Sequence, residues 1–421
     1  MQDAKLVLPK YSLFFLRYHM NFLKFDGRGT TIPGITNNQL KKIIFPLAPL
    51  NEQHRIVAKI EELFSEIDKG VESLQTAKAQ LQVYRQALLK HAFEGKLTAQ
   101  WRADNPDKVV PAAQLLAQIQ QAREERYQQQ LADWKTAVEK WELGGKEGKK
   151  PSKLKKTKVT SSLTKEELAN LSILPEGWQW VRFEELLFSI RGGTTAPPVD
   201  HETEYPILRS SSVRSGRINY ADVRYLTREQ LKSSADFIEP QILLFSRLNG
   251  TVDFVGNCAL VGSNFPKNVI YPDRLYGAKL VDTRWAKFYE LVFSSPNIRR
   301  GIEKKAKSTA GHKRISISDI TDIAVPLLGL DEVEQIVSEL EEKITVITEN
   351  EYQIDKEIQR TEALRQSILK KAFSGQLVPQ NPNDEPASQL LARIQTEKSE
   401  RETHEEMGKK VRKPRKTKAA S

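Results

Sequence analysis

The chain has 421 residues, 39% of them hydrophobic, so it is long enough for two or three domains with cores of their own. Lys and Arg outnumber Asp and Glu by 65 to 54, and the resulting charge of +11 favours an anionic partner such as nucleic acid. The single cysteine, Cys258, excludes an intrachain disulfide framework and a cysteine-based zinc cluster, and this suits a reducing cytoplasm.

The first 25 residues contain a short apolar run that Lys10, Arg17 and Lys24 interrupt. The run is too short to span a membrane and has no signal-peptide cleavage pattern. We therefore expect it to be part of a folded domain, with no membrane partner.

The chain contains two copies of one module. Residues 46–97 align with residues 326–377 at a constant offset of 280 without a gap, and 17 of the 52 positions are identical. The copies are most alike at their ends, "YRQALLKHAFEGKL" (84–97) and "LRQSILKKAFSGQL" (364–377). The likeness continues through "VPAAQLLAQIQ" and "EPASQLLARIQ" to the basic runs "GKKPSKLKKTK" and "GKKVRKPRKTK". The repeat is therefore a whole module with a basic tail.

Each copy has heptad spacing, which predicts one long helix at 51–93 and one at 331–373. The heptad positions are Ile60, Ile67, Leu74, Leu81 and Leu88, with Ile56, Leu63, Ala77 and Tyr84 on the alternate seam, and in the second copy Leu340, Ile347, Ile354 and Ile368, Thr361 being the exception. At about 1.5 Å per residue each helix spans roughly 60 Å. A one-sided seam needs a partner, and the nearest candidate is the other copy; the alternative is that each helix packs on a separate globular body. Further charged helices are expected at about 111–143 and 386–407.

Residues 174–325 differ from the repeats, because Gly, Pro, Ser and aromatic residues replace the heptads. Short apolar runs predict a mostly β domain with some helix, opened by "LPEGWQWVRFEELL". We expect Trp178 and Trp180 to anchor a strand in the core. The fold class is therefore α+β: a β-rich domain plus two long helices.

Four polar loops of this domain combine residues suited to DNA. Arginine contacts guanine edges through two hydrogen bonds and asparagine contacts adenine, while glycine lets backbone N–H groups approach a phosphate. A solvated surface role remains open for each side chain, and the clustering over four loops is what favours DNA. The candidates are Arg191, Gly192, Gly193, Thr194, Arg209, Ser211, Arg214, Arg247, Asn249, His312, Lys313 and Arg314.

Catalytic motifs are missing from the sequence. There is no G-x-x-x-x-G-K-[ST] phosphate loop, no H-E-x-x-H helix and no Asn-Pro-Pro-aromatic tetrapeptide of amino-methyltransferases. His312 has no second metal ligand near it in the sequence. We predict a non-catalytic chain without a cofactor or a metal site.

The arrangement resembles the specificity (S) subunit of type I restriction-modification systems. The resemblance lies in "LPEGWQWV", "IRGGTT", "ISISDITDIAVPL", the helix starts "PLNEQHRIV" and "GLDEVEQIV", and above all in the two helix ends quoted above. It implies that the helices pair antiparallel as a coiled-coil spacer. It also implies that each target-recognition domain reads one half of a bipartite DNA site and that methyltransferase (M) subunits dock on the helical regions, with a restriction (R) subunit bound through them.

The resemblance divides the chain into six segments. These are a C-terminal remnant of a first target-recognition domain (1–45), a first helical spacer (46–100), a helix and basic linker (101–173), a target-recognition domain (174–325), a second helical spacer (326–380) and a helix with a basic tail (381–421). The remnant is inferred because "DAKLVLPKYSLFF" resembles "GAKLVDTRWAKFY". A domain cut through a strand should be poorly stable unless a separate front fragment or a second chain completes it, and a truncated or split gene product is the favoured interpretation.

The helical regions supply the residues expected to contact M subunits: Glu52, Gln53, Ile56, Arg85, Phe93, Glu334, Gln335, Arg365 and Phe373. Gly329 and Val333 stand where the first copy has Pro49 and Gln53, so the two docking faces need not be equivalent. The alternative function is a coiled-coil adaptor whose basic tails bind nucleic acid without sequence preference.

Overall fold

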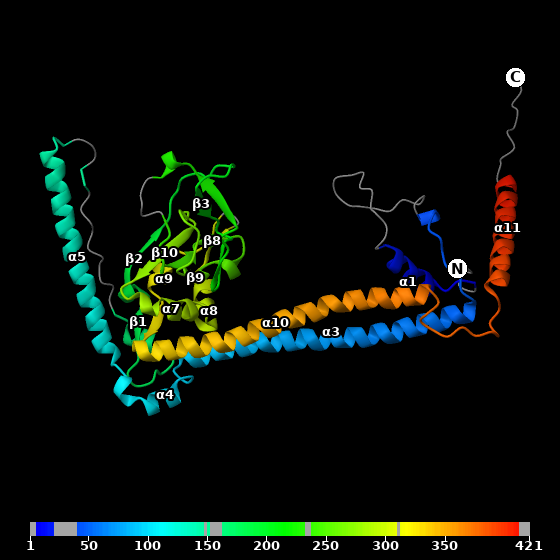
Figure 1. Ribbon diagram of the computed structural model, residues 1–421, viewed down its shortest axis with the longest axis horizontal. Coiled ribbons are helices and arrows are strands. Elements are labelled where there is room, and N and C mark those ends of the chain that lie inside the picture. Colours follow the sequence, from blue (N-terminus) through cyan, green and yellow to red (C-terminus); the bar gives the residue numbers. More distant parts are fainter. Residues whose placement is uncertain are drawn as a thin grey trace, which may run out of the picture. The chain divides into compact units, whose positions relative to one another are not determined.

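The computed structural model describes residues 6–20, 40–146, 150–151, 162–231, 237–309 and 312–411, and for residues 20, 307–309, 312 and 405–411 it describes the backbone alone (Figure 1). The chain forms two compact units. One contains Met1–Gln80 and Glu349–Ser421, and the other contains Leu81–Thr348. Most of both predicted basic runs lies outside the described residues, as do residues 1–5 and 21–39 of the predicted domain remnant.

Two helices of 44 residues, α3 (Leu50–Phe93) and α10 (Leu330–Phe373), confirm the predicted long helices. Each ends two residues before a glycine in the left-handed region, Gly95 at φ 70° and Gly375 at φ 73°. Such a glycine terminates a helix without a steric penalty, which explains why both helices stop at the same point of the repeat.

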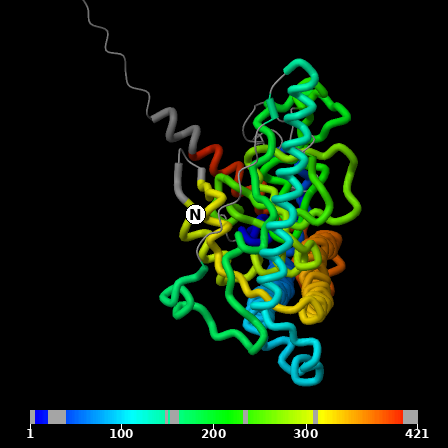
Figure 2. Tube along the Cα trace, turned by 90° about the vertical axis from the view of Figure 1, so that its left-hand side faces the viewer, coloured from blue at the N-terminus to red at the C-terminus, as the bar shows by residue number. Residues whose placement is uncertain are grey.

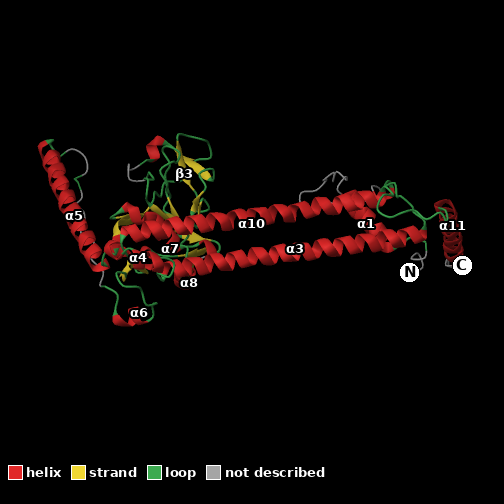
Figure 3. Ribbon diagram, turned by 60° about the horizontal axis from the view of Figure 1, so that its bottom comes forward, coloured by secondary structure: helices red, strands yellow, loops and turns green. Residues whose placement is uncertain are grey.

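The two helices pair antiparallel, as Figures 1 and 3 show. In the first unit Asp68 contacts Arg365 at 2.5 Å and Lys78 contacts Asp355 at 2.5 Å, so the partner number falls as the α3 number rises. In the second unit the Arg85 guanidinium donates a hydrogen bond of 3.1 Å to Thr348 Oγ1. The seam is buried at Ile60, Leu88, Leu340 and Ile347 as predicted, but Tyr84 is 52% exposed, so its placement on the seam was wrong.

The first unit has a small aromatic core around α1 (Pro9–Met20). Tyr11, Phe14, Ile56, Ile60 and Leu369 belong to this core. The Tyr11 hydroxyl donates to the carbonyl of Pro46 at 2.8 Å, and its ring lies 5.3 Å from that of Phe373. The described part of the predicted remnant, residues 6–20 and 40–45, contributes Tyr11, Phe14 and Phe45 to the packing on the helices. The unit ends with α11 (Ala387–Val411), which confirms the last predicted helix.

The second unit begins with α4 (Ala99–Asp104), η2 (Pro106–Lys108), α5 (Ala112–Leu143) and α6 (Lys165–Ala169). Helix α5 confirms the helix predicted at 111–143 and buries only Ala112, Leu115 and Ile119. Figure 2 shows α5 in front of the β-rich part of the unit, and Arg123 of this helix donates to the carbonyl of Glu184 at 3.3 Å.

The β-rich part holds all thirteen named strands. They are β1 (Gln179–Arg182), β2 (Leu187–Gly192), β3 (Tyr205–Leu208), β4 (Val213–Arg214), β5 (Arg217–Ile218), β6 (Val223–Leu226), β7 (Leu243–Ser246), β8 (Leu248–Asn249), β9 (Cys258–Leu260), β10 (Leu275–Leu280), β11 (Lys307–Thr309), β12 (His312–Arg314) and β13 (Ala324–Leu327). Short helices connect them: η3 (Phe183–Leu186), η4 (Arg228–Gln230), η6 (Val252–Phe254), η7 (Thr283–Trp285), α7 (Ala286–Phe293), α8 (Pro296–Lys305) and α9 (Ile317–Thr321).

The sheets are small and antiparallel, and the largest has the order β2-β10-β7-β9. A three-stranded sheet has the order β11-β12-β8, and β1-β13, β3-β6 and β4-β5 form pairs. Phe183, Phe245 and Phe293 pack edge to face in the core, with ring centroids 4.7–6.1 Å apart. Trp178 is buried as predicted. The α+β class is confirmed, while the six segment boundaries stay a prediction.

Among the described residues, no helix is both long and apolar enough to cross a membrane.

Candidate nucleic-acid interface

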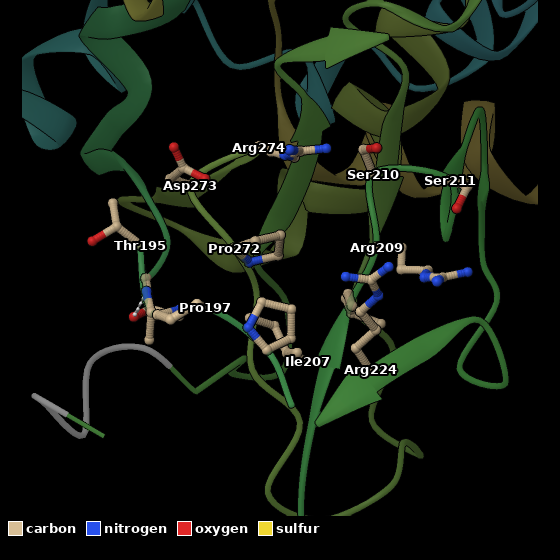
Figure 4. A pocket seen from close by; sticks show the side chains of 14 residues that line it. Thr195, Pro197, Ile207, Arg209, Ser210, Ser211, Arg224, Pro272, Asp273 and Arg274 are labelled. Atoms are coloured by element: carbon tan, nitrogen blue, oxygen red, sulfur yellow. Dashed lines mark hydrogen bonds between the residues drawn. The ribbon is translucent and has the colours of Figure 1, made fainter. Parts of the chain in front are cut away.

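A groove of about 550 Å³ opens on the β-rich part of the second unit, and three arginines line it: Arg209, Arg224 and Arg274. Figure 4 shows Arg209 and Arg224 on one wall and Thr195 and Pro197 on the other. The single carboxylate of the lining belongs to Asp273. An excess of guanidinium groups around an open groove is an electrostatic match for a polyanion.

The strand pair β3-β6 positions Arg209 and Arg224. Ile207 on β3 faces Arg224 on β6, so the Arg224 side chain stands beside the end of β3 that leads to Arg209. The Arg209 N–H donates to Ser212 Oγ at 2.8 Å, which fixes the turn, and its guanidinium lies 3.5 Å from the carboxylate of Asp222. Ser211 donates its hydroxyl to the same carboxylate. Arg209 and Ser211, both predicted candidates, are thus held by one aspartate.

Arg224 and Arg274 were missed by the sequence analysis. Both are exposed, and in the part of the chain that the structure describes neither guanidinium has a hydrogen-bond or ion-pair partner. Arg274 sits in a turn closed by the hydrogen bond of 3.0 Å from Leu275 N–H to the carbonyl of Pro272. The signal in the sequence was the turn "YPDRL" before a strand, where an arginine is pushed outward.

Arg247 connects the groove with polar residues on the neighbouring strands β8 and β12. Its N–H donates to the carbonyl of Arg274 at 2.9 Å, and its guanidinium donates to the carbonyl of Asp273 at 3.1 Å. The same guanidinium lies 5.7 Å from the ring of Tyr276, whose pKa is raised by burial. The row continues on β8 and β12, where Asn249 faces Lys313 and Leu248 faces Arg314.

Gly193 and Thr194 have a packing role that replaces the predicted phosphate contact. The Gly193 N–H donates to the carbonyl of Leu275 at 3.4 Å and the Thr194 N–H to that of Tyr271 at 3.0 Å, so neither is free for a phosphate. The Thr194 hydroxyl accepts from Ala196 N–H at 3.2 Å, and Thr194 is 7% exposed. A Cβ on Gly193 would lie 1.9 Å from the Tyr271 carbonyl oxygen, which explains the glycine.

The remaining candidates lie on the strands β2, β4 and β12. Gly192 ends β2, and the Arg191 guanidinium lies 5.7 Å from the ring of Tyr271. The Arg214 guanidinium lies 4.3 Å from the ring of Phe254, which follows β8. The backbone of His312 belongs to β12, but its side chain is outside the described residues.

The described residues contain no group of three His, Cys, Asp or Glu side chains that could hold a metal ion. Cys258 is 1% exposed, and burial raises the pKa of its thiol well above the ordinary value. The thiolate, which is the nucleophile and metal ligand, is therefore disfavoured there.

The residues predicted to contact M subunits are mostly internal. Glu52, Gln53 and Ile56 are buried, and the Gln53 amide accepts from Leu8 N–H at 2.9 Å and donates to the Ala48 carbonyl at 2.8 Å. The start of α3 buries these three side chains within their own unit, and the assignment of the whole set to M-subunit contact stays a prediction. Two of the other residues pack on aromatic rings: Phe93 on Phe288 and Phe373 on Tyr11. Three have polar partners: Arg365 pairs with Asp68, Arg85 donates to Thr348 and Gln335 donates to Glu339. The side chain of Glu334 is exposed.

Comparison with known proteins gives one consistent result. Residues 2–75 match the family described as the type I restriction modification DNA specificity domain. Over 409 residues the chain is 27% identical to the EcoKI specificity subunit of Escherichia coli strain K12, which covers 95% of the chain and 74% of that subunit. It is 25% identical over 372 residues to the E. coli EcoAI specificity subunit, covering 75% of the chain but 55% of that subunit. The E. coli EcoDI specificity subunit is 38% identical over 97 residues, 22% of its length.

A solved structure concerned with complex assembly and conformational transition of the type I R-M system has a similar fold. The TM-score is 0.56 at 18% identity, over 89% of this chain and 73% of that one. At this identity the likeness concerns the fold, and the fold is a β-rich domain with paired long helices.

Proposed function

The chain belongs to the specificity subunits of type I restriction-modification systems, and from this premise we propose that its β-rich domain selects the DNA sequence on which the system acts. The chain is the non-catalytic DNA sequence-specificity component. The M and R subunits that it recruits supply the chemistry. The observation that carries the proposal is the groove with three arginines, two of them unpartnered among the described residues.

The two kinds of arginine in and beside the groove have different roles. Among the described residues the guanidinium groups of Arg224 and Arg274 have no partner, and such groups match the two acceptors of a guanine edge in the major groove. Arg209 and Arg247 are oriented by Asp222 and Asp273, at 3.5 and 3.6 Å, and these carboxylates offset part of their charge. We assign base readout to the first pair and positioning on the backbone to the second.

The test compares an Arg224→Ala/Arg274→Ala variant with the matched control Arg360→Ala, which removes one charge from an exposed ion pair on α10. The chain is assembled with its M subunits, and affinity is measured for a duplex selected from a randomised pool and for a scrambled duplex. Loss of one good guanine contact costs about 1–3 kcal/mol, so we expect at least a tenfold loss that is confined to the selected duplex.

An equal loss on both duplexes would favour the adaptor, which binds nucleic acid without sequence preference. Raising the salt concentration separates the two functions further, because phosphate contacts weaken with salt and base contacts do so less. Equal affinity of the wild-type assembly for both duplexes at high salt would overturn the proposal.

A further inference from the structure

Asp273 supplies the single carboxylate of the groove, which is otherwise lined by arginines, hydroxyl groups and apolar side chains. Figure 4 shows Asp273 beside Arg274, and its side chain is 42% exposed. A carboxylate in this place repels the phosphates that the three arginines attract, so it weakens the attraction of the groove for a polyanion. A carboxylate is useful there only if it accepts a hydrogen bond from a donor.

The backbone of Asp273 is fixed on both sides. Its N–H donates to the carbonyl of Thr194 at 2.8 Å, and its carbonyl accepts from the Arg247 guanidinium at 3.1 Å. Thr194 is buried, so moving the segment that carries Asp273 would break a hydrogen bond to the interior of the domain. The side chain therefore starts from one defined position, as a group that reads a ligand requires.

The carboxylate itself has no hydrogen-bond donor among the described residues. Its Oδ2 lies 3.6 Å from the Arg247 guanidinium, which is beyond hydrogen-bond distance. Aspartate in a turn often accepts from a nearby backbone N–H, but here Leu275 N–H donates to the carbonyl of Pro272 instead. In the part of the chain that the structure describes, both carboxylate oxygens thus keep lone pairs that a donor of a bound ligand can occupy.

Base edges in the major groove offer two donors, the N4 amino group of cytosine and the N6 amino group of adenine. Adenine carries its N7 acceptor next to the amino group, and this lone pair repels a carboxylate. Cytosine has no acceptor of its own beside N4, so a carboxylate accepts from it without this repulsion. Guanine and thymine present only acceptors to hydrogen bonding in this groove, which makes a carboxylate unfavourable at either base.

We propose that Asp273 is a specificity-determining residue that accepts a hydrogen bond from the N4 amino group of a cytosine in the target. The inference rests on the proposed function, because it requires the groove to face base edges. It adds a second base to the guanines assigned to Arg224 and Arg274, and it names the group that recognises this base. The target then contains a cytosine whose selection depends on Asp273.

The first test selects duplexes from a randomised pool with the chain assembled with its M subunits, as wild type and as Asp273→Asn. Asparagine keeps the size of the side chain but presents a donor and an acceptor, a combination that fits adenine. One cytosine position of the wild-type motif should change to adenine, or lose its preference, in the variant. The matched control Asp107→Asn removes an exposed carboxylate of η2 outside the groove and should select the wild-type motif.

The second test changes the DNA and leaves the protein as it is. N4-methylcytosine at the selected position replaces the amino hydrogen that faces the major groove, whereas 5-methylcytosine, the control, leaves it in place. The wild-type assembly should bind the N4-methyl duplex at least about tenfold more weakly than the unmodified duplex, because one hydrogen bond to a charged group is lost. Asp273→Ala should bind these two duplexes equally.

Three results would overturn the inference and leave the proposed function intact. The first is a motif that Asp273→Asn does not change. The second is binding that N4-methylation does not weaken, or that both methyl groups weaken equally. The third is the same change of motif in Arg247→Ala, because Asp273 would then act only by orienting Arg247. Selection of no motif by the wild type would overturn the proposed function together with this inference.

Discussion

Gly193 shows how tightly the backbone of the groove is packed. Its Cβ position would lie 1.9 Å from the Tyr271 carbonyl oxygen, whereas a Cβ on Gly250 would meet no atom within 4 Å. We expect Gly193→Ala to lower the free energy of unfolding by about 1–3 kcal/mol, because the two backbone segments must separate. Gly250→Ala, in the same domain, should change it by less than about 0.5 kcal/mol. Chemical denaturation of both variants checks this, and similar changes in the two would contradict it.

Asp384 gives the first unit a measurable pH dependence. Its carboxylate lies 2.7 Å from the Arg55 guanidinium, which lowers the pKa of Asp384. A lowered pKa adds stability above the unfolded value of about 3.9, and this stability is lost as the pH falls through the folded value.

We therefore expect wild type to be more stable than Asp384→Asn at pH 6, with the difference shrinking below about pH 4. Urea unfolding of both proteins between pH 6 and pH 3 measures it. A difference that stays constant over this range would show that the ion pair does not contribute.

Sequence reasoning at this scale succeeded for side chains in loops and failed where distant segments meet. Arg209, Ser211 and Arg247 were expected near one site. Arg209 and Ser211 line the groove, and Arg247 donates to the carbonyl of Asp273, which also lines it. The packing of Gly193 on Tyr271 depends on a contact across 78 positions, which no local pattern encodes. Arg224 was missed because it lies in a strand, and only the pairing of β6 with β3 turns it toward the groove.

The equivalent glutamates at the starts of α3 and α10 differ in their surroundings, and this predicts unequal mutational effects. Glu332→Ala leaves Trp178, Thr98 and Arg102 without their acceptor, so it should cost roughly 3 kcal/mol, as breaking a buried ion pair does. Glu52→Ala removes a carboxylate to which no described residue donates a hydrogen bond, so it should cost less than about 1 kcal/mol. Urea unfolding monitored by circular dichroism compares the two variants, and an equal cost would contradict this prediction.

The long helices were predicted to within one residue, whereas the strand order was not. Heptad spacing and the glycines after Phe93 and Phe373 are local signals, so they predict the ends of the helices without knowledge of the fold. The order β2-β10-β7-β9 joins strands far apart in the chain, and its register depends on the whole core. The burial of Gln53 and Ile56 at the start of α3 could not be predicted from sequence, because it depends on packing against the rest of the first unit.

At the scale of the whole molecule, the net charge of +11 supplies an attraction for DNA that does not depend on sequence. Selectivity has to come from a smaller set of groups that meet base edges, and the groove offers Arg224 and Arg274 for this purpose. The duplicated module contributes paired helices in both units, and in the second unit its strand β13 pairs with β1.

The most direct test of the central claim is selection of duplexes from a randomised pool by the chain assembled with its M subunits, at a salt concentration that suppresses phosphate-driven binding. The account predicts that sequencing of the retained DNA reveals a defined motif. It also predicts that Arg224→Ala/Arg274→Ala removes part of that motif while Arg360→Ala preserves it. Retained DNA with no enriched sequence, or a motif unchanged by the groove variant, would contradict the account.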